Sequence, residues 1–194
     1  MPSPRLILAS ASPRRQSLLR DAGYEFDVDA AEVDESAHPP GLLPAQVAMY
    51  LAEAKAKAVA MRHVEDVVLA ADTVVTFGDQ ILGKPSDSAH ARAMLELLSG
   101  TTHLVITGLC VMNLMSQFQR TTRVISAVRM RPLSRAEMDH YISSGDWEGK
   151  AGGYGIQDPD PFVTRQAGSR TNIIGLPMST VRQMLAEAGI QANK

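Results

Sequence analysis

Apolar residues gather along this chain either in short continuous runs, typical of buried strands, or at the spacing of amphipathic helices. Runs at residues 5–10 and 24–29 predict strands, and the segment 14–22 between them predicts a helix. A Pro- and Gly-rich loop at 38–44 leads into residues 44–62, whose apolar positions lie on one helical face. The chain therefore begins with a strand–helix–strand unit and continues with a long amphipathic helix.

The middle of the chain alternates between strand and helix patterns. The stretches "VVLAAD" and "VVTF", at 67–72 and 74–77, predict two β segments, and "GDQ" after them predicts a hairpin turn. Residues 86–100 begin with Ser and Asp, continue with a stripe of Ala, Met and Leu, and end at Gly, as helices do. Two long strands are predicted at 102–114 and 121–130, which adds an antiparallel hairpin to the sheet.

The last third of the chain adds two helices and two short strands. A helix is predicted over 133–145, where a Ser and a Glu have the spacing of a capping box, and another over 178–188. Strands are predicted at 161–165 and 172–175. Strands that alternate with helices predict an α/β or α+β fold with a mixed sheet. No linker divides the chain, so we expect residues 1–194 to form one domain with two lobes and a central cleft.

Composition excludes several classes of function. The formal net charge is −2 and only 5% of the residues are aromatic, which argues against a broad nucleic-acid-binding surface. The single cysteine, Cys110, excludes a disulfide within the chain and a cysteine-based zinc site. No signal peptide precedes the first strand, and no window approaches the ~20 apolar residues of a membrane span. We therefore expect a cytoplasmic protein that binds neither nucleic acid nor membrane.

The stretch "LILASASPRRQSLL" (residues 6–19) places Arg14 and Arg15 side by side at the start of a predicted helix. Cations are disfavoured there, because the free N–H groups of the first turn already make that end positive. The arginine pair is therefore either a solvated surface feature or half of an anion-binding site.

Several acidic positions and one lysine are further candidates for chemistry. Asp72 follows a strongly apolar run, and the end of a buried strand is where a ligand crevice forms, although a carboxylate that caps a turn is the alternative. Glu32, Asp34 and Glu35 form a cluster that suits a hard divalent cation, but spacing alone favours a solvated acidic loop. Lys84 is either a phosphate-binding cation or a surface lysine, and sequence alone favours the surface.

The stretch "KAGGYGIQ" (150–157) is rich in glycine, which lets backbone N–H groups approach an oxyanion or a base closely. Its spacing matches neither a P-loop nor a dinucleotide fingerprint. Tyr154 and Gln157 are the side chains in it that are able to read a ligand. The five histidines are scattered and show no metal-ligand spacing.

Seven stretches follow one another along the chain: "LILASASPRRQSLL", "EVDES", "LAEAKAKAVA", "VLAADTVV", "ILGKPSD", "KAGGYGIQ" and "GLPMS". In this order and spacing, from residue 6 to about residue 188, the chain resembles the Maf proteins, the septum-formation-inhibitor-like nucleotide pyrophosphatases. The resemblance implies a mixed α/β fold of the Maf and inosine-triphosphatase type, with a cleft between two lobes. It also implies hydrolysis of a nucleoside triphosphate to the monophosphate and pyrophosphate, assisted by a divalent metal cation, Mg²⁺ or Mn²⁺.

The resemblance also implies roles for particular residues. Asp72 corresponds to the family's proton acceptor, and Asp72 together with Glu35 would hold the metal. The positions that match the family's polar cleft are Ser10, Arg14, Arg15, Glu35, Lys55 and Lys84, and all of these except Glu35 would bind the triphosphate. An arginine fork donates two hydrogen bonds to phosphate oxygens and does not lose its proton, which would account for the arginine pair at a helix start.

Three positions separate the branches of the family. Arg14, Thr73 in "ADT" and Gln157 in "YGIQ" resemble the branch that acts on dTTP and UTP. The sibling branch, associated with 7-methyl-GTP, usually carries a Trp after the Pro, "SDQ" at the aspartate and a stretch of the "FK.EG" type, and this chain has none of them. The resemblance thus implies dTTP and UTP as substrates, with modified pyrimidine nucleotides as an extension in nucleotide-pool house-cleaning.

Two stretches depart from the family pattern. Arg170 stands where the family often has an aromatic residue. Two Asp-Pro steps, Asp158-Pro159 and Asp160-Pro161, replace a commoner glycine-rich continuation. We expect both departures to alter the rim of the cleft without touching the chemistry.

Two other functions stay open from the sequence. One is a non-catalytic, nucleotide-sensing regulator of cell division or septum formation, and the other is a pyrophosphatase that acts on modified purine nucleotides. Asp72, Glu35 and Lys84 favour an enzyme, because a sensor needs the cations but has less use for the carboxylates. A homodimer is compatible with the resemblance.

Overall fold

The structure is a computed structural model that describes residues 4–159 and 161–193. Its strands are β1 (Leu6–Leu8), β2 (Asp27–Val28), β3 (Val67–Phe77), β4 (Gln80–Leu82), β5 (Thr102–Asn113), β6 (Phe118–Met130) and β7 (Val163–Ala167). Its helices are α1 (Pro13–Asp21), α2 (Pro44–Ala60), α3 (Ser88–Leu98), α4 (Arg135–Ser144), α5 (Arg170–Ile174) and α6 (Met178–Glu187), and a 3₁₀ turn, η1, spans Ala151–Gly153.

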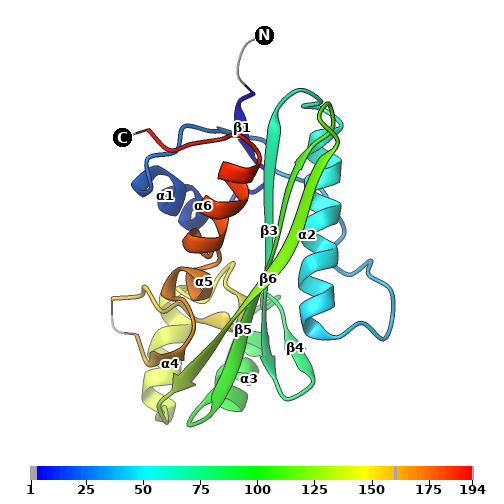
Figure 1. The fold of residues 1–194 in the computed structure, drawn as a ribbon. Coiled ribbons are helices and arrows are strands. Elements are labelled where there is room, and N and C mark those ends of the chain that lie inside the picture. Colours follow the sequence, from blue (N-terminus) through cyan, green and yellow to red (C-terminus); the bar gives the residue numbers. More distant parts are fainter. Residues whose placement is uncertain (1–3, 160, 194) are drawn as a thin grey trace.

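All these strands belong to one mixed sheet in the order β2-β1-β3-β5-β6-β7, with β4 added beside β3. β1 is parallel to β2 and β3, whereas the other pairs are antiparallel. The three long strands β3, β5 and β6 run through most of the length of the molecule (Figure 1). α2 lies along one side of them, α1 and α6 lie on the other side near one end, and α3 and α4 lie near the opposite end (Figure 1).

Alternate side chains of β3 contribute to different cores. Ala70 faces α2 and is buried with the small side chains of that helix. Ala71 faces the other way, into a core shared with α1 and α6. Farther along the same face, Val75 belongs to a second core that α3, α4 and β6 build. Thr73 lies on this face between Ala71 and Val75, so β3 joins two separate cores at that residue.

One edge of β3 has different partners along its length. Near its start Leu69 pairs in parallel with Leu8 of β1, and near its end Val75 pairs in antiparallel with Leu82 of β4. Residues 70–74 have no strand on this edge in the part of the chain that the structure describes, whereas β5 pairs with them along the other edge. The gap between β1 and β4 leaves space beside the middle of β3.

Gly108 of β5 allows α2 to approach the sheet closely. It pairs with Asp72 of β3. A Cβ atom at this position would lie 2.2 Å from the carbonyl oxygen of Ala48 in α2, closer than any real contact. A larger residue would therefore push α2 off the sheet, together with Lys55, which lies about two turns farther along the helix.

The mixed α/β class is confirmed, and α1, α2, α3, α4 and α6 form where the helical patterns predict them. The β stretches predicted at 67–72 and 74–77 are confirmed, but they form one continuous strand, β3, so the expectation that Asp72 ends a strand is wrong. Asp72 therefore lies in mid-strand and not at a strand end. Its carboxylate is paired with Lys55, so the charge does not interrupt the ladder with β5.

The strand predicted at 172–175 is also wrong, because this segment belongs to α5 and the turn after it. The side chain of Ser169 accepts a hydrogen bond from the N–H of Asn172 and caps the start of α5. Gly175 ends the helix in a left-handed conformation, with φ 118°. The cap and the glycine override the apolar pair that resembled a strand. The other terminal strands form with shifted ends, and β2 has only two residues.

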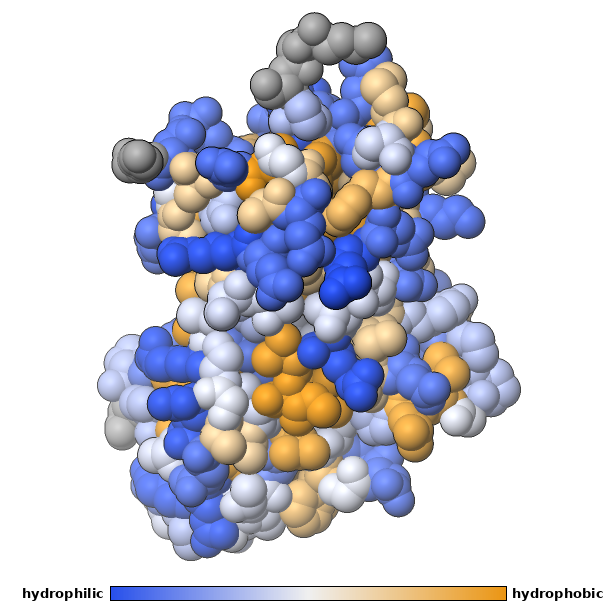
Figure 2. Space-filling model, viewed as in Figure 1, coloured by the Kyte–Doolittle hydropathy of each residue, from blue (hydrophilic) through white to orange (hydrophobic). Residues whose placement is uncertain are grey.

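The surface seen from the side of Figure 1 is mostly hydrophilic, and its most extended apolar patch lies in the lower half of the view (Figure 2). Among the described residues, no helix combines the length and apolar character that crossing a membrane requires.

Candidate active site

A cleft of about 700 Å³ opens at the gap beside β3. It is bordered by the end of β1, the start of α1, the segment after β4, and residues 148–157. The nine site residues that the family resemblance implies all line it: Ser10, Arg14, Arg15, Glu35, Lys55, Asp72, Thr73, Lys84 and Gln157. Residues that are up to 147 positions apart in the chain, from Ser10 to Gln157, thus meet at one site.

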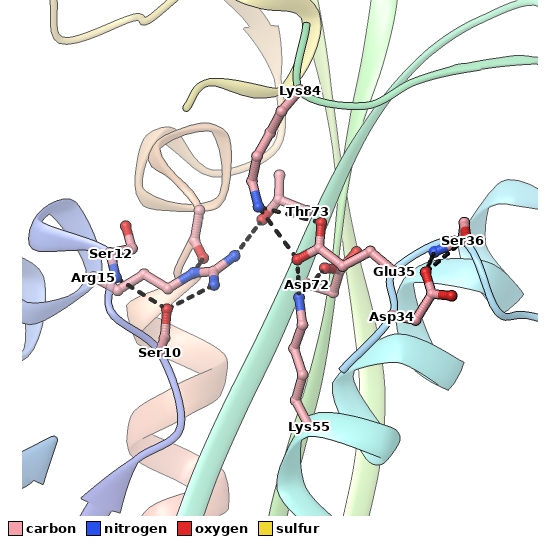
Figure 3. A network of polar contacts seen from close by, with 11 residues as sticks. Ser10, Ser12, Arg15, Asp34, Glu35, Ser36, Lys55, Asp72, Thr73 and Lys84 are labelled. Atoms are coloured by element: carbon pink, nitrogen blue, oxygen red, sulfur yellow. Dashed lines mark hydrogen bonds and ion pairs between the residues drawn. The ribbon is translucent and has the colours of Figure 1, made fainter. Parts of the chain in front are cut away.

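The centre of the cleft holds Glu35, Lys55, Asp72 and Lys84, which we call the carboxylate cluster. Lys55 Nζ lies 2.6 Å from Asp72 Oδ1 and 2.7 Å from Glu35 Oε1. Lys55 and Asp72 are only 7% and 6% exposed. Lys84 Nζ donates to both oxygens of Glu35 at 3.2 Å (Figure 3). Two lysines from different elements therefore converge on two carboxylates.

Glu35 is the only member of its acidic stretch that joins this cluster among the described residues. Asp34 instead accepts hydrogen bonds from the N–H and the hydroxyl of Ser36, in a local turn on the surface. Glu32 is exposed and does not line the cleft. Partial burial acts to raise the pKa of Glu35, but the hydrogen bond and charge of Lys55, together with Lys84, hold it below its ordinary value. Glu35 is therefore held as an anion by its two lysines.

Arg15 connects three elements on the other side of β3. Its Nη1 donates to Ser10 Oγ at 3.0 Å, its Nη2 to Thr73 Oγ1 at 3.2 Å, and its Nε to the carbonyl oxygen of Gly175 at 2.9 Å (Figure 3). Burial lowers the pKa of Arg15, and the negative charges of Asp72 and Glu35 act in the opposite direction. The guanidinium is thus fixed in position at the border of the cleft.

Thr73 supports Arg15 in this structure. Its hydroxyl contacts Arg15 and lies 2.9 Å from Thr107 Oγ1, and Thr107 also donates to the carbonyl oxygen of Asn172. The hydroxyl of Thr73 is therefore engaged with protein groups. Sequence reasoning did not find Thr107 or Gly175, because no motif marks a β-strand Thr or a carbonyl oxygen as a partner of an arginine.

Arg14 reaches the opposite border of the cleft. Its Nη2 donates to the carbonyl oxygen of Gly149 at 2.9 Å. Burial lowers the pKa of Arg14, while the negative charge of Asp158 raises it. Residues 149–158, which we call the glycine loop, carry Gln157 into the lining of the cleft. Arg14 is thus tied to the same loop that presents Gln157.

Tyr154 of the glycine loop points inward and is 5% exposed. Its hydroxyl forms a hydrogen bond with His103 Nε2 of β5. Burial lowers the pKa of His103 to about 4, so this imidazole is neutral near neutral pH. The sequence pattern identified Tyr154 as a ligand-reading side chain, whereas the structure shows it paired with a buried histidine.

One of the two stretches that depart from the family pattern contacts the glycine loop, and the other begins within it, at Asp158. Arg170 Nη2 donates to the carbonyl oxygen of Ile156 at 3.4 Å. Asp158 is held by groups of α4 and of the loop itself. Asp160, in the second Asp-Pro step, lies outside the described residues.

The carboxylate cluster offers at most two carboxylate ligands to a metal ion. The described residues contain no group of three or more His, Cys, Asp or Glu side chains placed to hold one. Mg²⁺ commonly binds through one or two carboxylates and completes its shell with water and substrate phosphates. Glu35 and Asp72, both hard oxygen donors, therefore fit a cation that arrives with a phosphate ligand.

The chain is similar to known proteins over nearly its whole length. The family model for Maf-like proteins matches residues 5–188. A "dTTP/UTP pyrophosphatase" from Paramagnetospirillum magneticum is 49% identical over 93% of this chain and 95% of its own length. A "dTTP/UTP pyrophosphatase" from Cereibacter sphaeroides is 45% identical over 95% of each chain. A solved structure titled as a nucleoside-triphosphatase or dITP/XTP pyrophosphatase, from Mycobacterium abscessus, is 12% identical over 95% of this chain and 97% of its own, with a TM-score of 0.43.

Proposed function

Because the chain belongs to the Maf family, we propose that its cleft hydrolyses dTTP and UTP to the nucleoside monophosphate and pyrophosphate. The protein is a nucleotide pyrophosphatase, a hydrolase of phosphoric anhydrides, like the relatives that match nearly its whole length. The observation that carries the assignment of the site is the convergence of the nine candidate residues on one cleft.

The charges that line the cleft suit a triphosphate. Five Lys and Arg side chains line it, against three Asp and Glu side chains, although the whole chain has a net charge of −2. Arg15 and Lys84 would contact phosphate oxygens, and the hydroxyl of Ser10 orients Arg15 from behind. Such fixed cations neutralise the charge that develops on the leaving pyrophosphate. The unfavourable position of Arg15 at a helix start is then compensated when the substrate is bound.

Asp72 is the proton acceptor in this proposal. It is buried in mid-strand, and Lys55 at 2.6 Å fixes the orientation of its carboxylate. An attacking water molecule would give its proton to Asp72, and the nearby ammonium group stabilises the arrangement of charges. Lys55 thus orients Asp72, in addition to any contact that it makes with phosphate.

We propose that Glu35 and Asp72 hold a divalent cation, Mg²⁺ or Mn²⁺. When bound, such a cation would neutralise phosphate oxygens and make the phosphorus atom more open to attack. Lys55 is bound to both carboxylates in the described structure, so the same two groups are already placed side by side.

Base selection is assigned to Arg14, Thr73 and Gln157. Gln157 carries an amide that both donates and accepts hydrogen bonds, as the edge of a pyrimidine does. Arg14 of α1 is held beside the same loop, because its side chain donates to the carbonyl oxygen of Gly149. Thr73 would act indirectly, since its hydroxyl is bonded to Arg15. A site whose polar groups pair with one base rejects a base that leaves them unpaired.

The test is a panel of canonical and modified nucleoside triphosphates, with Mg²⁺ or Mn²⁺, assayed for pyrophosphate. We expect dTTP and UTP to give pyrophosphate and the monophosphate, and no product when the cation is chelated. In water enriched in oxygen-18, the label shows which phosphorus atom is attacked, because it enters the monophosphate only after attack at the α-phosphorus.

Other outcomes of the panel would point to other functions. Release of orthophosphate and a nucleoside diphosphate would place the attack at the terminal phosphate and contradict the proposal. Binding of nucleotides without turnover would favour the sensor of nucleotides in cell division. A preference for modified purine nucleotides would keep the reaction and change the substrate.

We further propose that the enzyme acts in the cytoplasm, on free nucleotides and without a nucleic-acid partner. The absence of a membrane-crossing helix from the described residues and the small net charge support this proposal. Cell fractionation and sedimentation of the purified protein would test the location and whether a homodimer forms.

A further inference from the structure

The glycine loop has a flexible backbone, so contacts with other groups are needed to hold it in one conformation. Gly149, Gly152 and Gly153 all have positive φ values, of 65°, 70° and 72°. Glycine loses more conformational freedom on folding than any other residue, so a loop with three of them needs other contacts to keep one shape. One contact comes from the residue that follows β4, since the N–H of Gly152 donates to the carbonyl oxygen of Gly83 at 2.9 Å.

The side chain that holds the rest of the loop is Asp158. Its Oδ1 accepts a hydrogen bond from Lys150 Nζ at 2.5 Å, and its Oδ2 accepts from Tyr141 of α4 at 2.8 Å and from the N–H of Gly155 at 3.0 Å. The side chains of Lys150 and Asp158 are only 12% and 9% exposed. Asp158 therefore closes the loop by bonding its first half to its second and fixes both to α4.

Asp158 also lies close to the residues assigned to the base. A Cβ atom at Gly155 would lie 2.5 Å from Asp158 Oδ1 and 2.8 Å from Gln157 Nε2, so both side chains pack over this glycine. Burial lowers the pKa of Arg14, and the negative charge of Asp158 acts against this more strongly than any other charge. The carboxylate thus packs near Gln157 and lies within electrostatic reach of Arg14.

We propose that Asp158 is a positioning residue for base selection, which acts through the Lys150–Asp158 pair on Gln157 and Arg14. This inference rests on the proposed function and names the part of the site that separates uracil and thymine from cytosine. A glutamine amide can pair with uracil in one orientation and with cytosine in the reversed one, because it both donates and accepts. Selection therefore depends on holding the loop, and with it the amide and Arg14, in one arrangement.

The test compares Asp158→Asn with wild type. The variant keeps the shape of the side chain but places an uncharged amide or carbonyl against Lys150. We expect KM for UTP to rise about tenfold and the ratio of kcat/KM between UTP and CTP to fall by about the same factor, with kcat little changed. Tyr141→Phe, which removes one donor to Asp158 and keeps the packing of the ring on Phe162, should shift the ratio in the same direction by less.

Asp66→Asn is the matched control. Asp66 accepts hydrogen bonds from the backbone and side chain of Arg5, and its side chain is 13% exposed, but it lies outside the cleft. It should leave the kinetic constants and the base ratio unchanged. An unchanged ratio in both loop variants, or equal losses for all bases, would overturn the inference.

Failure of the proposed function has a different signature. If the wild-type enzyme releases no pyrophosphate, the reaction is wrong. Binding of UTP and CTP analogues with a nitrogen atom between the α- and β-phosphorus atoms then decides the inference alone. Asp158→Asn should lower the preference for the UTP analogue in that assay, and an unaltered preference would contradict the positioning role.

Discussion

The carboxylate cluster and the glycine loop face each other across one cleft, but their positions are fixed by different means. Lys55 and Asp72 project from the middle of a long helix and a long strand, whose packing is fixed by the core. Gln157 projects from a loop with three left-handed glycines, which Asp158 holds together. The proposed proton acceptor and its lysine thus sit on regular elements, whereas Gln157, proposed to read the base, sits on a loop that depends on a few side-chain contacts.

The largest expected effect is that of Asp72→Asn in the carboxylate cluster. Loss of the proton acceptor should lower kcat by about 10²–10⁴-fold while nucleotide binding and the fold persist. Asp79→Asn, in the exposed turn after β3, is the matched control and should leave kcat unchanged. Pyrophosphate release at saturating UTP measures both. Near-normal turnover in Asp72→Asn would contradict the role of Asp72.

Lys55→Met tests whether the cluster is also a structural unit. It leaves the buried carboxylate of Asp72 without its ammonium partner, and breaking such a pair typically costs about 3–5 kcal/mol of stability. Lys57→Met, an exposed lysine of the same helix, should change the free energy of unfolding by less than about 0.5 kcal/mol. Urea titrations compare the two variants. Equal stability would show that the ion pair contributes nothing to the fold.

His103 makes the stability of the loop region depend on pH. Its pKa falls from an ordinary 6.5 to about 4 on burial, so the unfolded chain binds a proton more readily than the folded one between these values. The contribution of His103 to the free energy of unfolding is therefore complete above pH 6.5. It is lost as pH falls toward about 4, by an amount on the order of 3 kcal/mol. His103→Gln should flatten this part of the stability curve, whereas the exposed His140→Gln should not. A slope unchanged in His103→Gln would contradict the assignment.

The smallest effect is expected for Arg14→Ala, at the residue of α1 that is bonded to the glycine loop. Loss of a charged donor to the ligand typically costs about 1.5–3 kcal/mol, which is about one to two powers of ten in kcat/KM for dTTP and UTP. The ratio of kcat/KM for dTTP and UTP to that for CTP and GTP should fall as well. If Arg14 were only a surface residue, kinetics would not change and stability would rise by at most about 1 kcal/mol. Arg20→Ala, on the same helix but outside the cleft, is the control.

Much of the fold could be predicted from the spacing of apolar residues and from the capping and turn residues at the ends of elements. The long amphipathic helix of 44–62 and the helix of 133–145 with its capping box have unambiguous patterns, and both form. The segment 172–175 is apolar in a way that fits either state, and its helix depends on the cap of Ser169 and on Gly175. Asp72 looked like a strand end because a charge in mid-strand is costly, and only the packing of α2 supplies Lys55 to compensate it.

The candidate site could be predicted as a set of residues but not as a geometry. The motifs identified nine of the side chains that line the cleft. That Thr73 bonds Arg15, or that Asp158 bonds Lys150 and Tyr141, depends on contacts between distant or irregular segments that have no sequence periodicity. The gap beside β3 likewise follows from the lengths of β1 and β4, which are set by tertiary packing.

The three long strands β3, β5 and β6 pass without interruption beneath both cores. A continuous ladder of this kind resists bending, so the sheet has no hinge between the two cores. The floor of the cleft is therefore preorganised, and a nucleotide that enters finds Asp72 and Thr73 already at their working separation. Adaptation to a different substrate would therefore have to occur at the rim of the cleft.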